Sequence, residues 1–172
     1  MKFNFKDLNF KDFNYKEKLP KQLHDPVHML ALGFGSGLAP KAPGTFGTLA
    51  AIPLFLLLSL LPLWLYIVVV IAACTYGVHL CGKTADDMGE HDAPSIVWDE
   101  FAGFWITMIA IPVSFTTVLI GFLLFRFFDI LKPWPIDWID RQVSGGLGIM
   151  LDDIVAGFMA LGCLHLINYF LL

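Results

Sequence analysis

Acidic and basic residues gather in two segments of this chain, and each segment lies directly beside a long apolar run. The charged residues concerned are Asp99, Glu100, Arg126, Asp129, Lys132, Asp152 and Asp153. Charge beside membrane-like sequence is costly unless it is paired or has a function. Carboxylates in such a place suit a hard cation such as Mg²⁺, whereas arginine and lysine suit phosphate oxygens. The pattern therefore indicates phosphate chemistry assisted by a metal ion.

The composition places this chemistry at a membrane. Of the 172 residues, 57% are hydrophobic and only 15% are charged, with a mean hydropathy of +0.70. Soluble domains are usually about half apolar and about a quarter charged. No Lys, Arg, Asp or Glu occurs in residues 42–82, 101–125 or 154–172. Three apolar blocks thus alternate with three charged ones, as expected for a membrane protein.

The apolar blocks must be divided into spans before the charged residues can be brought together. The run from Thr45 to Cys81 exceeds the ~20 residues that cross a bilayer, and Pro62 splits it into a helical hairpin. Residues 101–125 allow one tilted span, or a hairpin that breaks near Pro112 and extends to Leu131. We favour the hairpin, because it keeps every charged segment on one side with the basic N-terminal segment. An all-α bundle of about four to five spans follows, and five spans put the C-terminus on the far side.

Two further regions complete the expected organisation. Residues 1–29 hold six of the eleven basic residues and predict a polar cytoplasmic tail, followed by a membrane-embedded domain over 30–172. Residues 32–50 contain five glycines and two prolines, so we expect a glycine-rich loop at the interface rather than a regular span. Such a loop suits phosphate binding by backbone N–H groups, and close helix packing is an equally good interpretation.

The charged segments differ in what their spacing indicates. The six carboxylates between Asp86 and Glu100 are typical of a solvated loop, but Asp99 and Glu100 directly precede an apolar run and should lie in the first turn of a buried helix. Arg126, Asp129 and Lys132 recur every three residues, which keeps them on one helix face, either as a functional group or as a structural ion-pair ladder. Gly145, Gly146 and Gly148 predict a tight turn into a helix whose first residues include Asp152 and Asp153.

Four ordered blocks of this sequence resemble the bacterial phosphatidylglycerophosphatase A family. These blocks are residues 33–37 with 43–45, residues 95–101, residues 125–136, and residues 145–157. The resemblance covers residues 28 to 170 or so and implies a Mg²⁺-dependent, multi-pass enzyme of the bacterial inner membrane. Its active site would face the cytoplasm and release the terminal phosphate of phosphatidylglycerophosphate, giving phosphatidylglycerol. Other Mg²⁺-dependent head-group enzymes and a non-catalytic membrane scaffold are the alternatives.

The resemblance also implies roles for individual residues. We expect metal ligands among the acidic positions, phosphate binding by two basic residues, and acid-base assistance from three others. The metal ligands would be Asp99, Glu100, Asp152, Asp153 and Asp87; the phosphate-binding residues Arg126 and Lys132; and the acid-base residues Asp129, Asp92 and His91. The expected partners are the substrate in the cytoplasmic leaflet and membrane lipids, with no nucleic acid. The sequence does not indicate the nucleophile, the number of metal ions or the oligomeric state.

Overall fold

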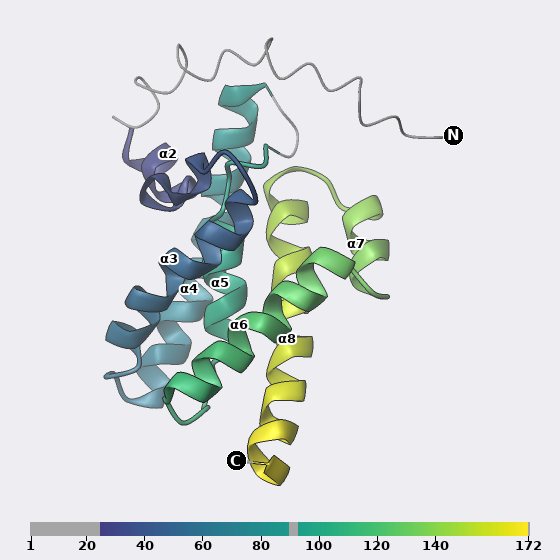
Figure 1. Cartoon of the computed structure of the whole chain (residues 1–172). Coiled ribbons are helices and arrows are strands. Elements are labelled where there is room, and N and C mark those ends of the chain that lie inside the picture. Colours follow the sequence, from purple (N-terminus) through teal and green to yellow (C-terminus); the bar gives the residue numbers. More distant parts are fainter. Residues whose placement is uncertain (1–24, 90–92, 172) are drawn as a thin grey trace.

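The computed structural model describes residues 25–89 and 93–171, and in these ranges every regular element is a helix (Figure 1). The predicted all-α class is therefore confirmed. In chain order the elements are α2 (Pro26–Ala31), η1 (Gly33–Leu38), α3 (Pro43–Leu58), α4 (Leu63–Met88), α5 (Trp98–Thr107), α6 (Phe115–Leu131), α7 (Ile136–Gln142) and α8 (Gly145–Leu171). The helix α2 starts four residues inside the stretch predicted as a tail.

Both predicted hairpin turns lie where the prolines indicated. Helix α3 ends at Leu58 and α4 begins at Leu63, directly after Pro62. Helix α5 ends at Thr107, and the chain passes Pro112 before Ser114 caps the first turn of α6. A single helix over residues 101–125 is thereby excluded.

Two helix boundaries differ from the sequence-based expectation. Helix α4 continues through Met88, because no residue breaks it before Gly89, which adopts a left-handed φ of 69°, and because Lys83 and Asp87 pair at i,i+4. Helix α8 starts at Gly145, which has a left-handed φ of 72°, and Gly146 and Gly148 lie inside the helix rather than in a turn before it. Asp152 and Asp153 consequently lie in the third turn of α8, and the prediction that they lie in its first turn is wrong.

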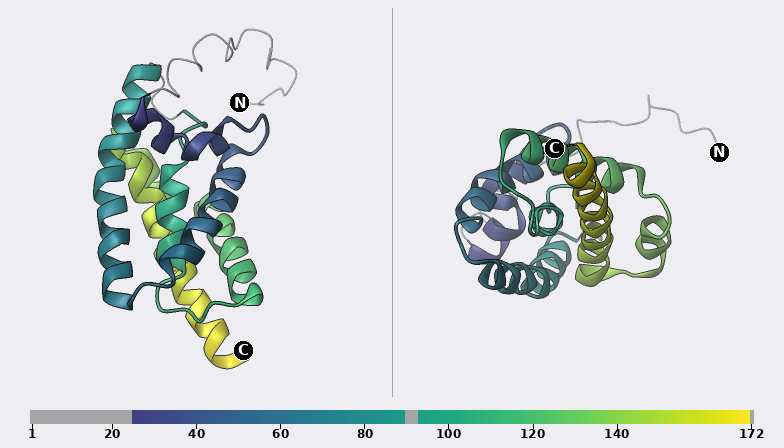
Figure 2. Two further views of the ribbon diagram at one scale, coloured as in Figure 1. Left: turned by 90° about the vertical axis from the view of Figure 1, so that its left-hand side faces the viewer. Right: turned by 90° about the horizontal axis from the view of Figure 1, so that it is seen from below.

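Helix α5 is the centre of the bundle and packs against α3, α4, α6 and α8 (Figure 2, right). All its residues from Glu100 to Thr107 are buried. Its two indoles satisfy their N–H groups on neighbouring helices: Trp98 donates to Ala73 O at 3.1 Å and Trp105 donates to Ala51 O at 3.2 Å. These bonds fix α5 against α4 and α3.

Helices α5 and α8 run in the same direction and approach closely through two glycines. A Cβ atom at Gly157 would lie 2.5 Å from Gly103 O and 3.1 Å from Ile106 Cβ, closer than packing allows. Glu100 and Asp153 lie about one turn from these glycines, toward the same end of the bundle. The glycine contact therefore sets the distance between the acidic residues of the two helices.

We expect Gly157→Val to destabilise the protein by about 1–3 kcal/mol, because the added methyl groups overlap the α5 backbone. The measurement is thermal unfolding in detergent, compared with Gly162→Val. Gly162 is on the same helix, and a Cβ there would meet no atom within 4 Å. Equal unfolding temperatures for the two variants would contradict the close contact.

Two described helices are long and apolar enough to cross a membrane, α4 and the 145–170 part of α8. In the apolar 18-residue stretch of α4 only 28% of the residues are buried, so most of the apolar surface of this helix faces outward. Helix α2, helix α7 and the charged end of α4 lie at one end of the bundle, whereas the C-terminus lies at the other (Figures 1 and 2). The predicted clustering of charged segments at one end is thus present.

Candidate active site

A pocket of about 250 Å³ opens at the charged end of the bundle, between α3, α5, α6 and α8. It is lined by seven of the charged residues singled out from the sequence: Asp99, Glu100, Arg126, Asp129, Lys132, Asp152 and Asp153. These residues lie on α5, α6 and α8 and at the C-cap of α6, and the most distant two are 54 positions apart in the chain. The fold therefore brings the two charged segments into one site.

Three carboxylates in this pocket form a compact group. Asp99 and Glu100 are in the first turn of α5, as predicted, and Asp153 is on α8. One oxygen from each lies within 4.8 Å of the other two. Asp99 Oδ1, Glu100 Oε2 and Asp153 Oδ2 are buried without a hydrogen-bond partner among the described residues. Buried carboxylate oxygens are expensive unless they are satisfied, and a hard divalent cation is the ligand that prefers such oxygens.

Arg126 is a cation that lies directly beside this group. Its Nη1 pairs with Asp129 one turn further along α6 and lies 3.7 Å from Glu100 Oε1. The side chains of Arg126 and Glu100 are only 13% and 12% exposed, so their charges are poorly screened by water. Arg126 Nε has no hydrogen-bond partner within the described ranges. The guanidinium thus retains a donor for an anion in the pocket.

Lys132 closes the side of the pocket beside α7. Its Nζ donates to Asp140 Oδ1 at 2.6 Å and to Asp152 Oδ2 at 2.7 Å, which links α7 to α8. Burial opposes its charge, but these two hydrogen bonds outweigh burial and raise the pKa of Lys132. Asp152 Oδ1 also accepts from the Asp153 N–H at 3.0 Å, so both oxygens of Asp152 have partners. Lys132 is therefore a stable positive charge at the pocket wall.

Comparison with known proteins decides the family. The family model described as phosphatidylglycerophosphatase A matches residues 29–168. A protein of Escherichia coli (strain K12) named phosphatidylglycerophosphatase A is 54% identical over 149 residues, which cover 86% of this chain and 87% of the relative. The chain belongs to the phosphatidylglycerophosphatase A family. It is accordingly a phosphatase, a phosphoric monoester hydrolase.

Two other relatives extend the comparison. A phosphatidylglycerophosphatase A of Haemophilus influenzae is 48% identical over 152 residues, covering 87% of this chain and 93% of the relative. A protein of Bacteroides thetaiotaomicron, named as a candidate phosphatidylinositol-3-phosphatase, is 37% identical over 137 residues. These residues cover 75% of this chain and 85% of the relative. No solved structure matches the chain.

Of the three other predicted site residues of this phosphatidylglycerophosphatase A family member, the structure describes Asp87 alone. Asp87 does not line the pocket; its Oδ2 lies 2.9 Å from Lys83 Nζ and 3.2 Å from the buried His28 ring, where it ties α4 to α2. Asp92 and His91 fall outside the described residues, and their predicted acid-base role stays a prediction.

The structure shows two contacts at the pocket, made by Gly44 and Asp140, that the sequence did not predict. A Cβ at Gly44 would overlap Glu100 Oε1 and lie 3.0 Å from Arg126 Nη1, so a larger residue there would displace these two side chains in the pocket. Asp140 is the second acceptor for Lys132. The sequence gives no direct signal for either contact, because each depends on how distant helices pack.

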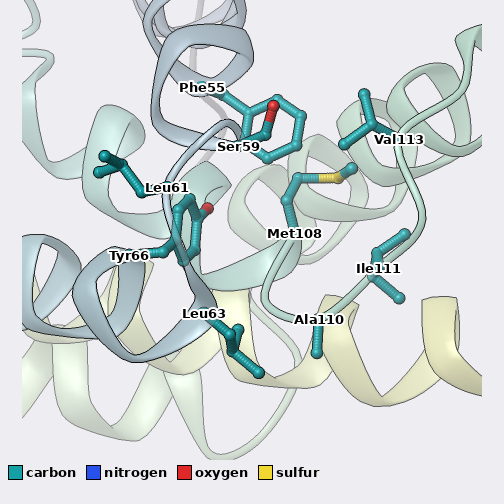
Figure 3. A pocket seen from close by; sticks show the side chains of 9 residues that line it. All are labelled: Phe55, Ser59, Leu61, Leu63, Tyr66, Met108, Ala110, Ile111 and Val113. Carbon is teal, nitrogen blue, oxygen red and sulfur yellow. The ribbon is translucent and has the colours of Figure 1, made fainter.

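A second pocket, of about 160 Å³, lies at the opposite end of the bundle and has different chemistry (Figure 3). Figure 3 shows apolar side chains from the turns after α3 and α5, such as Leu61 and Ile111, and from the start of α4, Leu63. Its polar groups are Ser59 and Tyr66, and the Tyr66 hydroxyl donates to Trp105 O at 2.7 Å. With no acid or base in its lining, this pocket does not suit phosphate hydrolysis.

Proposed function

We propose that the protein hydrolyses phosphatidylglycerophosphate to phosphatidylglycerol and inorganic phosphate in phospholipid biosynthesis, with Mg²⁺ as cofactor. Family membership and the names of the Escherichia coli and Haemophilus influenzae relatives support this substrate. The single observation that carries the site assignment is the grouping of unpartnered buried carboxylate oxygens beside Arg126 and Lys132. This combination suits a cation and a phosphate in one pocket.

Asp99, Glu100 and Asp153 would hold the cation, because one oxygen of each lies close to the other two, and one buried oxygen of each has no hydrogen-bond partner among the described residues. Such oxygen ligands are those that Mg²⁺ prefers. When bound, Mg²⁺ supplies positive charge that polarises a phosphate and lowers the pKa of an attacking water. Asp152 is engaged by Lys132 and positions that lysine, and we leave Asp87 out of the ion site because it pairs with Lys83 and His28.

The basic residues would bind the phosphoryl group. Arg126 offers its planar fork and Lys132 a point charge, and both neutralise phosphoryl oxygens as negative charge redistributes on them. Water would attack the phosphorus, the bond to the glycerol oxygen would break, and a proton would pass to that oxygen. Among the described residues of the pocket, Asp129 is the predicted group for this proton transfer.

The test is phosphate release by the purified protein in detergent micelles containing phosphatidylglycerophosphate. We expect release to stop on addition of EDTA and to return with excess Mg²⁺. Phosphatidylinositol 3-phosphate serves as the comparison substrate, and we expect slower release from it. Undiminished hydrolysis in EDTA would overturn the cofactor assignment, and hydrolysis of only the comparison lipid would overturn the substrate assignment.

We further propose a multi-pass arrangement of four to five spans in the bacterial inner membrane, with residues 1–29 and the pocket on the cytoplasmic side. The grouping of α2, α7 and the charged end of α4 at one end of the bundle supports it. A cysteine placed at Ser114, in the α5–α6 turn, should then react with a membrane-impermeant reagent only from the periplasmic side. Labelling of that cysteine from the cytoplasmic side would contradict the arrangement.

A further inference from the structure

An apolar groove of about 480 Å³ lies between α3 and α6. Its helical walls are Leu49, Ile52 and Leu56 on α3, and Val118, Leu119 and Phe122 on α6. No charged residue lines it, and the hydroxyl of Ser114 at its edge bonds to Thr117. Leu49, Leu56 and Leu119 are each 44–45% exposed, so the groove is open on its outer side. It can therefore receive an apolar ligand from the surrounding bilayer.

The same two helices connect this groove to the charged pocket. Helix α3 begins with Pro43 and Gly44, which line the pocket, and α6 ends with Arg126, Asp129 and Ile130, which line it too. At 1.5 Å per residue, the groove wall on α3 extends from about 8 to about 18 Å beyond Gly44. One leaflet contributes about 15 Å to the hydrocarbon core. An acyl chain of a lipid whose phosphate lies in the pocket would reach this depth.

The residue types of the groove favour a flexible chain over another helix. Helices associate in membranes mainly through small residues that let backbones approach. The residues of α3 and α6 that line the groove are Leu, Ile, Val and Phe, and the small residue in its lining is Ser114, at the N-cap of α6. Bulky side chains around an open groove leave space that bending methylene groups fill better than a regular helix surface does.

We propose that this groove binds an acyl chain of the lipid substrate and thereby positions the head group at Arg126 and the acidic group. The proposal rests on the proposed function. It predicts selectivity for substrates with long acyl chains, because a short chain ends before it reaches Ile52 and Leu56. The groove acts by positioning the substrate rather than through the hydrophobic effect, because the lipid tail is already in an apolar environment before it binds.

The experiment compares Leu119→Trp with Leu123→Trp. Both leucines are on α6, and they are 44% and 56% exposed, but only Leu119 lines the groove. The substrates are long-chain phosphatidylglycerophosphate and its dihexanoyl form, both presented in detergent micelles. We expect Leu119→Trp to lower kcat/KM for the long-chain substrate about tenfold, mostly through KM, and to leave the dihexanoyl substrate unchanged. Leu123→Trp should match wild type on both.

Other outcomes would overturn the proposal. An equal loss on both substrates at an unchanged unfolding temperature would mean that the groove does not discriminate acyl length, and a change of oligomeric state would mean that it binds a second copy. If Leu119→Trp does not fold, Leu49→Trp provides the same test from α3, with Leu57→Trp as its control. Failure of wild type to hydrolyse either chain length would instead refute the proposed function.

Discussion

Glu100→Gln and Asp153→Asn are each expected to lower Mg²⁺-dependent phosphate release at least about 100-fold. Each residue has a buried carboxylate oxygen without a hydrogen-bond partner in the described part of the chain, and one oxygen of Glu100 lies within 4.8 Å of one oxygen of Asp153. Changes to residues that merely support a metal ligand already cost about 10–100-fold, so loss of a ligand should cost no less. The measurement is the rate of phosphate release over a range of Mg²⁺ concentrations.

Asp137→Asn is the matched control for these variants. Asp137 is an acidic residue of the same end of the bundle, but it pairs with Arg141 at 2.7 Å on α7 and does not line the pocket. Its replacement should leave both the rate and the Mg²⁺ requirement unchanged. Full activity in folded Asp153→Asn protein would show that the acidic group is not the metal site.

Arg126→Ala should lower kcat/KM about 10³-fold, at the lower end of what an arginine contributes to phosphoryl transfer elsewhere. The guanidinium faces the acidic group, pairs with Asp129 and keeps Nε available for an anion. Arg126→Lys retains the charge but loses the planar fork, so we expect a smaller but still clear loss. Steady-state kinetics on the lipid substrate measure both effects.

Removal of Arg126 also leaves Glu100 and Asp129 without their cation, so stability must be followed separately. Thermal unfolding distinguishes a folding defect from a catalytic one, and Arg126→Lys preserves the charge balance. Arg141→Ala is the control, because that arginine is 71% exposed and pairs only with Asp137 among the described residues. Comparable kcat/KM values for Arg126→Ala and Arg141→Ala would contradict the phosphate-binding role.

The sequence predicted those features that depend on local pattern. Apolar runs and Pro62 and Pro112 located the two hairpin turns, since proline and run length act within a few residues. Asp99 and Glu100 were correctly placed in the first turn of α5, because an apolar helix follows them directly. The same local patterns predicted the all-α class and singled out the charged residues that line the pocket.

Features that depend on packing were not predictable in the same way. The position of Asp152 and Asp153 was wrong by two turns, because α8 already begins at Gly145 and accommodates Gly146, where a Cβ would overlap Val78 O of α4. Asp87 and Asp99 are both acidic residues of one segment, yet Asp87 lies in the last turn of α4 and Asp99 in the first turn of α5. Only the three-dimensional contacts show that Asp87 belongs to an ion pair, whereas Asp99 is a candidate metal ligand.

The most direct test of the central claim is Mn²⁺ binding followed by electron paramagnetic resonance in the detergent-solubilised protein. Mn²⁺ accepts the same oxygen ligands as Mg²⁺ and reports binding without turnover. We predict that wild type and Asp137→Asn bind Mn²⁺ in competition with Mg²⁺, and that Asp153→Asn binds it at least about tenfold more weakly. Unchanged Mn²⁺ affinity in Asp153→Asn and in Glu100→Gln would contradict the assignment of the metal site to these carboxylates.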